Sequence, residues 1–131
     1  VSGGDAGNKT RPEDKQNFTL LLTALRDELN AQGKKDKRDY LLTIAGPAGP
    51  KIIANLELDK IHKQLDWINV MGYDFHGGWD NVTGFNAPLY ASSTDPTEDE
   101  TIRKKFNVDS AVQAHLAAGV PSEKIVVGVP F

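Results

Sequence analysis

The stretch Trp67-Ile68-Asn69-Val70-Met71-Gly72-Tyr73-Asp74-Phe75-His76-Gly77-Gly78-Trp79 decides the fold and holds most of the candidate functional side chains. Its first half predicts a β-strand over residues 67–74, because Ile68 and Val70 alternate with polar or aromatic residues on a pleated surface. Gly77-Gly78 then breaks the strand into a loop. Polar and aromatic groups gather where this strand ends, which is where α/β enzymes place their chemistry.

Short apolar runs and amphipathic stretches alternate on both sides of this strand. The runs over residues 40–45 and 125–130 each predict a strand that is covered on both faces, as in a parallel sheet. Helical spacing of apolar residues predicts helices over 12–33, over about 57–65, and from Asn107 or Asp109 up to Gly119. The resulting order is helix, strand, helix, strand, loop, helix, strand, which is typical of parallel βα units.

A long irregular region over about 75–106 separates the central strand from the last helix. Such a length without regular structure is unusual inside a compact domain and is often a functional loop. His76 is expected to be a loop or cleft residue. The spacing of Asp74, His76 and Asp80 matches no specific pattern of metal ligands, so we expect no metal and no other cofactor.

The shorter loop over 46–50 is not expected to bind phosphate, because it lacks the ending of a phosphate loop and its prolines remove amide donors.

Composition and charge narrow the class of protein. The chain has 131 residues, enough for one modest core, and its 25% of charged residues are typical of a soluble globular chain. A net charge of −3 gives no reason to expect nucleic acid or an anionic membrane as partner. The absence of cysteine excludes disulfides and thiolate chemistry. No apolar run in the sequence approaches the length of a membrane span.

Two ways of closing the sheet fit these elements: a small open, doubly wound sheet, or part of a (β/α)8 barrel. Three strands cannot close a barrel, so composition alone favours the open sheet. The ends of the sequence favour the barrel segment, because Val1 follows no initiator methionine and Phe131 ends an apolar run without a polar tail.

Several stretches resemble the glycoside hydrolase family 18 chitinases, in order and in spacing. They are Leu42–Ala45, Leu65–Trp79 and Ala117–Phe131, and the helix over Asn17–Leu29 resembles the family helix after the fourth barrel strand. The Met-x-Tyr-Asp core at residues 71–74, with a tryptophan after it, is the most specific of these features. The resemblance covers nearly the whole chain.

The resemblance implies an α/β fold that is a partial (β/α)8 TIM barrel, covering about the fifth to seventh strands and their helices. Residues 1–131 are then an interior fragment of a single family 18 catalytic domain. The family's catalytic signature, Asp-x-x-Asp-x-Asp-x-Glu, is absent from the sequence, and the residues 1–4 resemble the loop that follows it. The proton-donating glutamate is therefore expected outside this chain, and the remaining segments of the same barrel are expected partners of these residues.

The resemblance also implies roles for individual side chains in a substrate-assisted mechanism, in which the N-acetyl carbonyl of the sugar attacks the anomeric carbon. Tyr73 would hold the acetamido group, and Asp74 would accept hydrogen bonds from the sugar. Met71 would pack beneath the acetamido methyl group. Trp79 would present an aromatic face to a neighbouring sugar, and Phe131 is a further candidate for substrate binding.

Other interpretations of these residues stay open from the sequence alone. Tyr73 could be a core tyrosine with a satisfied hydroxyl group, Asp74 could cap or turn the chain, and Met71 could be core packing. Gly72 stands where many family members carry Thr or Ser. Strand alternation predicts that the side chain at this position points away from the site.

The function implied by the resemblance is that of a secreted chitinase, which hydrolyses β-1,4-linked N-acetylglucosamine polymers with retention and binds chitin oligosaccharides. One alternative is a chitinase-like lectin that binds without hydrolysis. Another is a related endo-N-acetylglucosaminidase or an enzyme acting on glycoprotein or spore-wall sugars. Since the acid lies upstream of Val1 in this interpretation, residues 1–131 cannot discriminate the enzyme from the lectin.

Residues 1–131 on their own are expected to be inactive on chitin and not stably folded as a monomer, because strands cut from a barrel leave backbone groups unpaired at both edges. A measured rate of chitin hydrolysis above background would contradict the first expectation. A cooperative thermal unfolding transition of the monomer would contradict the second.

Overall fold

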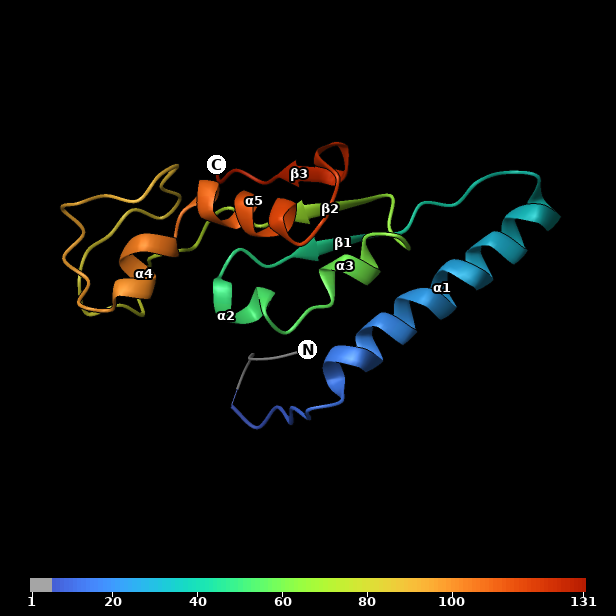
Figure 1. Ribbon diagram of the computed structural model, residues 1–131, viewed down its shortest axis with the longest axis horizontal. Helices are drawn as coiled ribbons and strands as arrows, with labels where there is room; N and C mark the ends of the chain where they lie inside the picture. The colour runs from blue at the N-terminus through green and yellow to red at the C-terminus, as the bar shows by residue number, and fades with distance from the viewer. Residues whose placement is uncertain (1–5) are drawn as a thin grey trace.

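The computed structural model describes residues 6–131 and contains a three-stranded parallel sheet with the order β1-β2-β3. The strands are β1 (Thr43–Gly46), β2 (Trp67–Val70) and β3 (Ile125–Val127). All three arrows point toward the same side of the molecule, so the carboxyl ends of the strands share one edge of the sheet (Figure 1). The prediction of an α/β fold with a parallel sheet is confirmed.

The helices connect and flank these strands. They are α1 (Asp14–Asp36), α2 (Pro50–Ile53), α3 (Leu58–Ile61), α4 (Glu100–Lys105), α5 (Val108–Ala117) and the 3-10 helix η1 (Ser122–Lys124). Within the described part of the chain, no helix is long and apolar enough to cross a membrane. The loop suggested for residues 1–4 lies outside the described residues.

Two short helices were not predicted: α2 begins at Pro50, the last residue of the predicted loop over 46–50, and α4 lies inside the irregular region predicted over about 75–106. Pro50 opens α2, where its fixed backbone angle suits the first helical turn. Asp99 precedes α4 and accepts hydrogen bonds from the amides of Thr101 and Ile102, at 2.7 Å and 3.3 Å. The long helix α1 continues beyond Gly33, its predicted end. It ends before Lys37, which adopts the left-handed conformation that is typical of helix ends.

All the predicted strands, and the helix over about 57–65, are shorter in the structure than the sequence suggested. The central strand ends at Val70 and not at residue 74. The amide of Gly72 donates back to the Val70 carbonyl at 2.9 Å, and the amide of Gly128 donates to the same oxygen at 2.8 Å. The chain therefore leaves the ladder at this point, and Tyr73 and Asp74 lie on irregular backbone beyond the strand.

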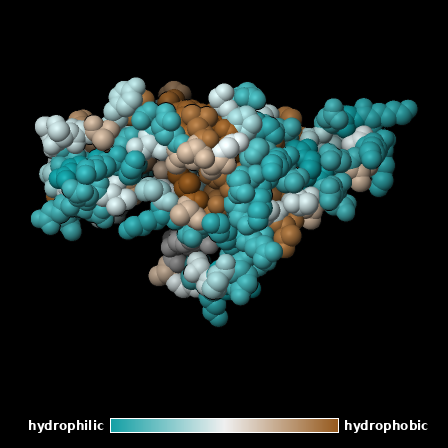
Figure 2. All heavy atoms as spheres, in the orientation of Figure 1, coloured by the Kyte–Doolittle hydropathy of each residue, from teal (hydrophilic) through white to brown (hydrophobic). Residues whose placement is uncertain are grey.

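The core lies on one face of the sheet. Ile68 and Val70 of β2 are fully buried there, together with Leu22, Ala48, Ile53, Leu56, Leu58, Ile61, Leu65, Phe75, Ala111 and Val120. Figure 2 shows apolar atoms gathered in the middle of one side of the molecule, between hydrophilic surfaces. The opposite face of β2 carries Trp67 and Asn69, which are only half-buried.

The prediction that the outer strands are covered on both faces is wrong for the described chain. Ala45 of β1 is exposed, and Val126 and Val127 of β3 are 44% and 41% exposed. These apolar side chains extend past the area that the described helices cover. Apolar content alone predicts burial without specifying which element supplies the cover.

Helix α1 contacts the body of the molecule mainly through polar groups. Of its predicted apolar face, Leu22 is buried, whereas Leu21 and Leu25 remain exposed. Arg26 makes several of the polar contacts: its guanidinium donates to the carbonyl of Gln64 at 2.8 Å and to that of Tyr40 at 3.0 Å.

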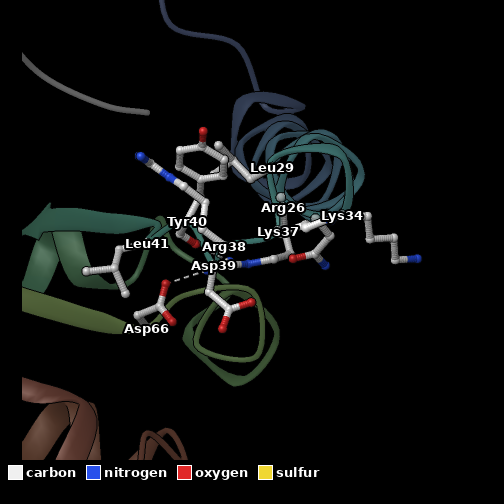
Figure 3. A pocket seen from close by; sticks show the side chains of 11 residues that line it. Arg26, Leu29, Lys34, Lys37, Arg38, Asp39, Tyr40, Leu41 and Asp66 are labelled. Carbon is white, nitrogen blue, oxygen red and sulfur yellow. Dashed lines mark hydrogen bonds and ion pairs between the residues drawn. The ribbon is translucent and has the colours of Figure 1, made fainter.

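Asp66 completes this contact at the amino end of the sheet. Its carboxylate pairs with the Arg26 guanidinium at 2.6 Å (Figure 3). The same carboxylate accepts the amide of Leu42 at 2.6 Å. Partial burial opposes the charge, but the amide and the guanidinium together lower the pKa of Asp66 below its ordinary value. The pair therefore joins α1 to the segments that lead into β1 and β2.

His115 of α5 is a fully buried titratable group in the core. Its Nδ1 lies 2.8 Å from the Ala111 carbonyl, and its Nε2 has no hydrogen-bond partner. Gly46 allows this close packing, because a Cβ at that position would lie 2.5 Å from Ile68 Cγ2 and 3.7 Å from His115 Nε2. Burial lowers the pKa of His115, against a smaller opposing effect of the carbonyl.

Stability is expected to decrease in acid because of His115. In the unfolded chain histidine binds a proton below about pH 6.5, whereas the folded chain resists protonation until a lower pH. The free energy of unfolding should therefore fall as the pH drops from about 6.5 toward the lowered pKa of His115. Denaturant unfolding of the full-length gene product at a series of pH values measures this slope. His115→Gln should flatten the slope, and Gln113→Ala, on the exposed side of α5, should leave it unchanged.

Candidate functional site

A cleft of about 400 Å³ lies at the carboxyl end of β2. Met71, Tyr73 and Asp74 line it, so the structure brings these predicted site residues together. The other lining residues are Pro47, Ala48, Gly49, Ile52, Phe75 and Phe106. A larger hollow of about 740 Å³ lies at the amino end of the sheet, beside Arg26 and Asp66 (Figure 3). Because parallel sheets carry their functional groups at the carboxyl ends of the strands, we take the smaller cleft as the candidate site.

The residue after β3 makes room for Tyr73. A Cβ at Gly128 would lie 3.0 Å from Tyr73 Cε1, so the half-buried ring rests against the bare backbone of Gly128. At Gly72 a Cβ would meet the Gly128 carbonyl at 3.1 Å and Val108 Cγ2 at 3.3 Å. Position 72 therefore faces α5, away from the cleft, as strand alternation predicted.

Asp74 adopts a left-handed backbone conformation with a φ of 57°. Aspartate tolerates this region better than most residues do. The side-chain amide of Asn86 donates to Asp74 Oδ1 at 2.9 Å, and the Asn86 carbonyl accepts the amide of Phe75 at 2.9 Å. The carboxylate thus lies exposed beside the cleft and is held by a residue on the long loop.

His76 lies inside the loop and does not line the cleft. It is 5% exposed, with Nδ1 3.4 Å from Asp80 Oδ2 and Nε2 3.5 Å from Asp95 Oδ2. At these distances neither contact is a well-aligned hydrogen bond, so the two carboxylates only flank the imidazole ring. Thr97, whose amide donates to Asp95 at 2.8 Å, lowers the pKa of Asp95 against the effect of burial, and His76 adds to this.

Gly84 covers the ring of His76. A Cβ at Gly84 would lie 2.7 Å from His76 Nδ1, closer than side chains allow. The loop therefore closes on itself around the buried imidazole. Within residues 6–131, no three acidic, histidine or cysteine side chains are arranged to hold a metal ion.

Trp79 and Phe131 do not line the cleft with the other predicted site residues. Trp79 is 68% exposed, and its indole ring lies over Gly77, where a Cβ would be 2.6 Å from Trp79 Cζ2. One part of the ring is thus supported by backbone, and the remainder faces outward. Phe131 is fully exposed at the end of the chain.

Sequence reasoning missed Asn86 and Phe106 as parts of the site. The rings of Phe75 and Phe106 lie with centroids 6.0 Å apart at an angle of 53°, and both line the cleft. Phe106 immediately precedes the Asn107 cap of α5, so the start of that helix could have suggested its position. Asn86 lies in an irregular loop whose residues follow no periodicity, so no comparable signal pointed to it.

Comparison with known proteins confirms the resemblance to family 18. The model of "Glycosyl hydrolases family 18" matches residues 3–131. Chitinase A1 of Niallia circulans is 50% identical over 131 residues, which are 100% of this chain and 19% of that protein. The chain therefore spans about a fifth of the length of this relative.

Solved structures agree with the sequence match. Chitinase ChiA74 from Bacillus thuringiensis superimposes with a TM-score of 0.88 at 48% identity, over 96% of this chain and 20% of that one. A mutant of the Group II chitinase catalytic domain 2 from Ostrinia furnacalis, in complex with an N-acetylated chitooligosaccharide, gives a TM-score of 0.81 at 35% identity. That match covers 94% of this chain and 29% of the other. The chain thus shares the fold of part of a chitinase barrel domain.

Two glycines of the loop should respond differently to the same substitution. Gly84→Ala places a methyl group against the His76 ring, whereas at Gly78 a Cβ meets nothing within 4 Å. Gly84→Ala should therefore destabilise the loop by about 1–3 kcal/mol, and Gly78→Ala should be neutral or slightly stabilising. Hydrogen exchange of the loop amides in the full-length gene product measures the effect. Equal protection in the two variants would contradict the packing of Gly84 on His76.

Proposed function

Because the chain belongs to the glycosyl hydrolases of family 18, we propose that it forms part of the active-site wall of a chitinase. The reaction is the hydrolysis of β-1,4-linked N-acetylglucosamine polymers with retention of configuration. The observation that carries this proposal is the convergence of Met71, Tyr73 and Asp74 on one cleft at the carboxyl end of β2. An apolar thioether side chain, a phenol and a carboxylate can contact the methyl, carbonyl and N–H groups of an acetamido sugar.

In this proposal Tyr73 and Asp74 orient the acetamido group of the substrate. The phenolic hydroxyl of Tyr73 donates to the acetamido carbonyl, whose charge changes as it attacks the anomeric carbon. Asp74 accepts hydrogen bonds from the sugar or from the acetamido N–H. Met71, which is 37% exposed, packs against the acetamido methyl group. Attack by the substrate's own carbonyl depends on orientation, and these side chains supply it.

The acid that protonates the leaving oxygen is proposed to lie on another segment of the same barrel. The sequence of 131 residues contains no Asp-x-x-Asp-x-Asp-x-Glu signature. We assign β1, β2 and β3 to the fifth, sixth and seventh barrel strands, a proposal supported by their order and parallel register. The remaining strands would cover the half-buried face of β2 and complete the site.

Trp79 and Phe131 are proposed to contact sugar units next to the reacting one. The exposure of both aromatic rings supports this role, because pyranose rings pack their C–H faces on aromatic surfaces. We also propose that the protein is secreted, since polymeric chitin cannot reach an enzyme that stays inside the cell.

A chitin-binding lectin is the second candidate function. The side chains that line the cleft can bind and orient a sugar in a lectin as well as in an enzyme. A related endo-N-acetylglucosaminidase would use the same residues on a different glycan. The coding sequence immediately upstream of Val1 separates enzyme from lectin: a glutamate at the end of the signature favours hydrolysis, and Gln or Leu favours binding alone.

A chimaera tests the proposal directly. The 131 residues that match in chitinase A1 of Niallia circulans are replaced by this chain, so that the host supplies the remaining barrel. The chimaera should hydrolyse chitin oligosaccharides, and product analysis with glycopeptides as rival substrates tests the glycan specificity. A folded chimaera without hydrolysis or binding would overturn the proposal.

Tyr73→Phe in the same chimaera should lower kcat on the order of 100-fold, because a preorganised donor to a carbonyl of changing charge is lost. KM should change only a few fold. Tyr90→Phe is the matched control, since Tyr90 is exposed on the loop and does not line the cleft. It should keep the kcat of the unsubstituted chimaera. Equal kcat values for the two variants would exclude Tyr73 from the reaction.

A further inference from the structure

We propose that Asn86 is a positioning residue that fixes the carboxylate of Asp74 for substrate. This inference rests on the proposed function, because it concerns how the sugar-binding wall of the cleft is held in place. It is independent of which residue supplies the acid.

Asn86 holds the turn after β2 at two points. Its side-chain Nδ2 donates to Asp74 Oδ1 at 2.9 Å, and its backbone carbonyl accepts the amide of Phe75 at 2.9 Å. The same Nδ2 lies 3.4 Å from the carbonyl of His76. A single loop residue therefore contacts consecutive residues of the segment that leaves the strand.

The conformation of Asp74 explains why such a contact is needed. Asp74 has a φ of 57°, a region that most residues with a side chain avoid, and it lies beyond the last ladder bonds of β2. An exposed carboxylate there has several side-chain rotamers available. The Asn86 amide engages Oδ1 and selects one of them, which leaves Oδ2 to accept from a sugar hydroxyl or an acetamido N–H.

The segment that carries Asn86 is itself anchored. The carbonyls of Pro88 and Leu89 accept the amides of Val108 and Asp109 at the start of α5, at 2.9 Å and 3.0 Å. Asn86 is thus bonded to the segment that follows β2, and the residues after Asn86 are fixed to α5.

On the other side of Asn86, the loop is closed around the buried His76 ring, which lies between Asp80 and Asp95 with Gly84 across it. Anchors on both sides of Asn86 make it a fixed support for Asp74. A side chain with this support can set a hydrogen-bonding direction, which a mobile loop tip could not do.

Two substitutions separate hydrogen-bond donation from packing. Asn86→Ala removes the side chain, and Asn86→Asp keeps its size but replaces the donor with a carboxylate that faces Asp74. Both leave the backbone carbonyl that accepts the Phe75 amide. If Asn86 acts through its amide, the two variants should lose activity together, whereas a packing role predicts that Asn86→Asp resembles the original protein.

The experiment measures steady-state hydrolysis of chitin oligosaccharides by the full-length gene product. We expect both Asn86 variants to lower kcat by about 10-fold to 100-fold, with KM changed less than about 3-fold, because a small misplacement of an orienting group acts on the reacting geometry. Asn81→Ala is the matched control, since Asn81 is an exposed asparagine of the same loop. It should keep the original kcat and KM.

The outcomes distinguish this inference from the proposed function. Loss of kcat in both Asn86 variants with an unchanged thermal midpoint, and a rotated Asp74 carboxylate in the crystal structure of Asn86→Ala, support the inference. An original-like kcat in Asn86→Asp overturns it while the proposed function stands. An unsubstituted protein that neither binds nor hydrolyses the oligosaccharides overturns the proposed function, and this role of Asn86 with it.

Discussion

The alternation of side chains along β2 is the constraint on which the rest of the structure depends. Ile68 and Val70 point into the core, and position 72 continues that face toward α5. Met71 and Tyr73 belong to the other face and reach the cleft. A shift by one residue would bury the cleft side chains and expose the core. Strand pairing on both sides of β2 excludes such a shift, since Ile68 pairs with Ile44 of β1 and with Ile125 of β3. The packing of the core therefore also determines which side chains face the cleft.

The two ends of the sheet differ in whether their polar groups are paired within the chain. At the amino end, Arg26 and Asp66 satisfy one another and the nearby backbone, and Lys124 donates to the carbonyls of His62 and Leu65 at 2.9 Å and 2.6 Å. Every donor and acceptor in these contacts has a partner within the chain, which is a stabilising arrangement. At the carboxyl end, charged and aromatic groups remain exposed. This division matches the rule that barrels keep stability at one face and function at the other.

The sequence predicted the elements whose signals are periodic and missed those that depend on single contacts. The central strand, the α5 helix and the order of the elements follow from apolar spacing. The short helices α2 and α4 do not, because each depends on one residue at its start: Pro50 opens α2, and Asp99 caps α4. The family motif predicted Tyr73 and Asp74 as site residues without any geometry, and their roles stay a prediction. Asn86 could not be found in this way, since its contact with Asp74 spans 12 residues of irregular loop.

The early end of β2 explains why the long loop is built as it is. Side-chain alternation continues from β2 to place Tyr73 toward the cleft, but the ladder itself stops at Val70 and does not hold Tyr73 or Asp74 in place. Other contacts hold them: the bare backbone of Gly128 beneath the Tyr73 ring, and the Asn86 amide on the Asp74 carboxylate. A loop can supply such contacts only if it is held in place. In this proposal the buried histidine and the hydrogen bonds to α5 act on the cleft indirectly, by holding the loop that carries Asn86.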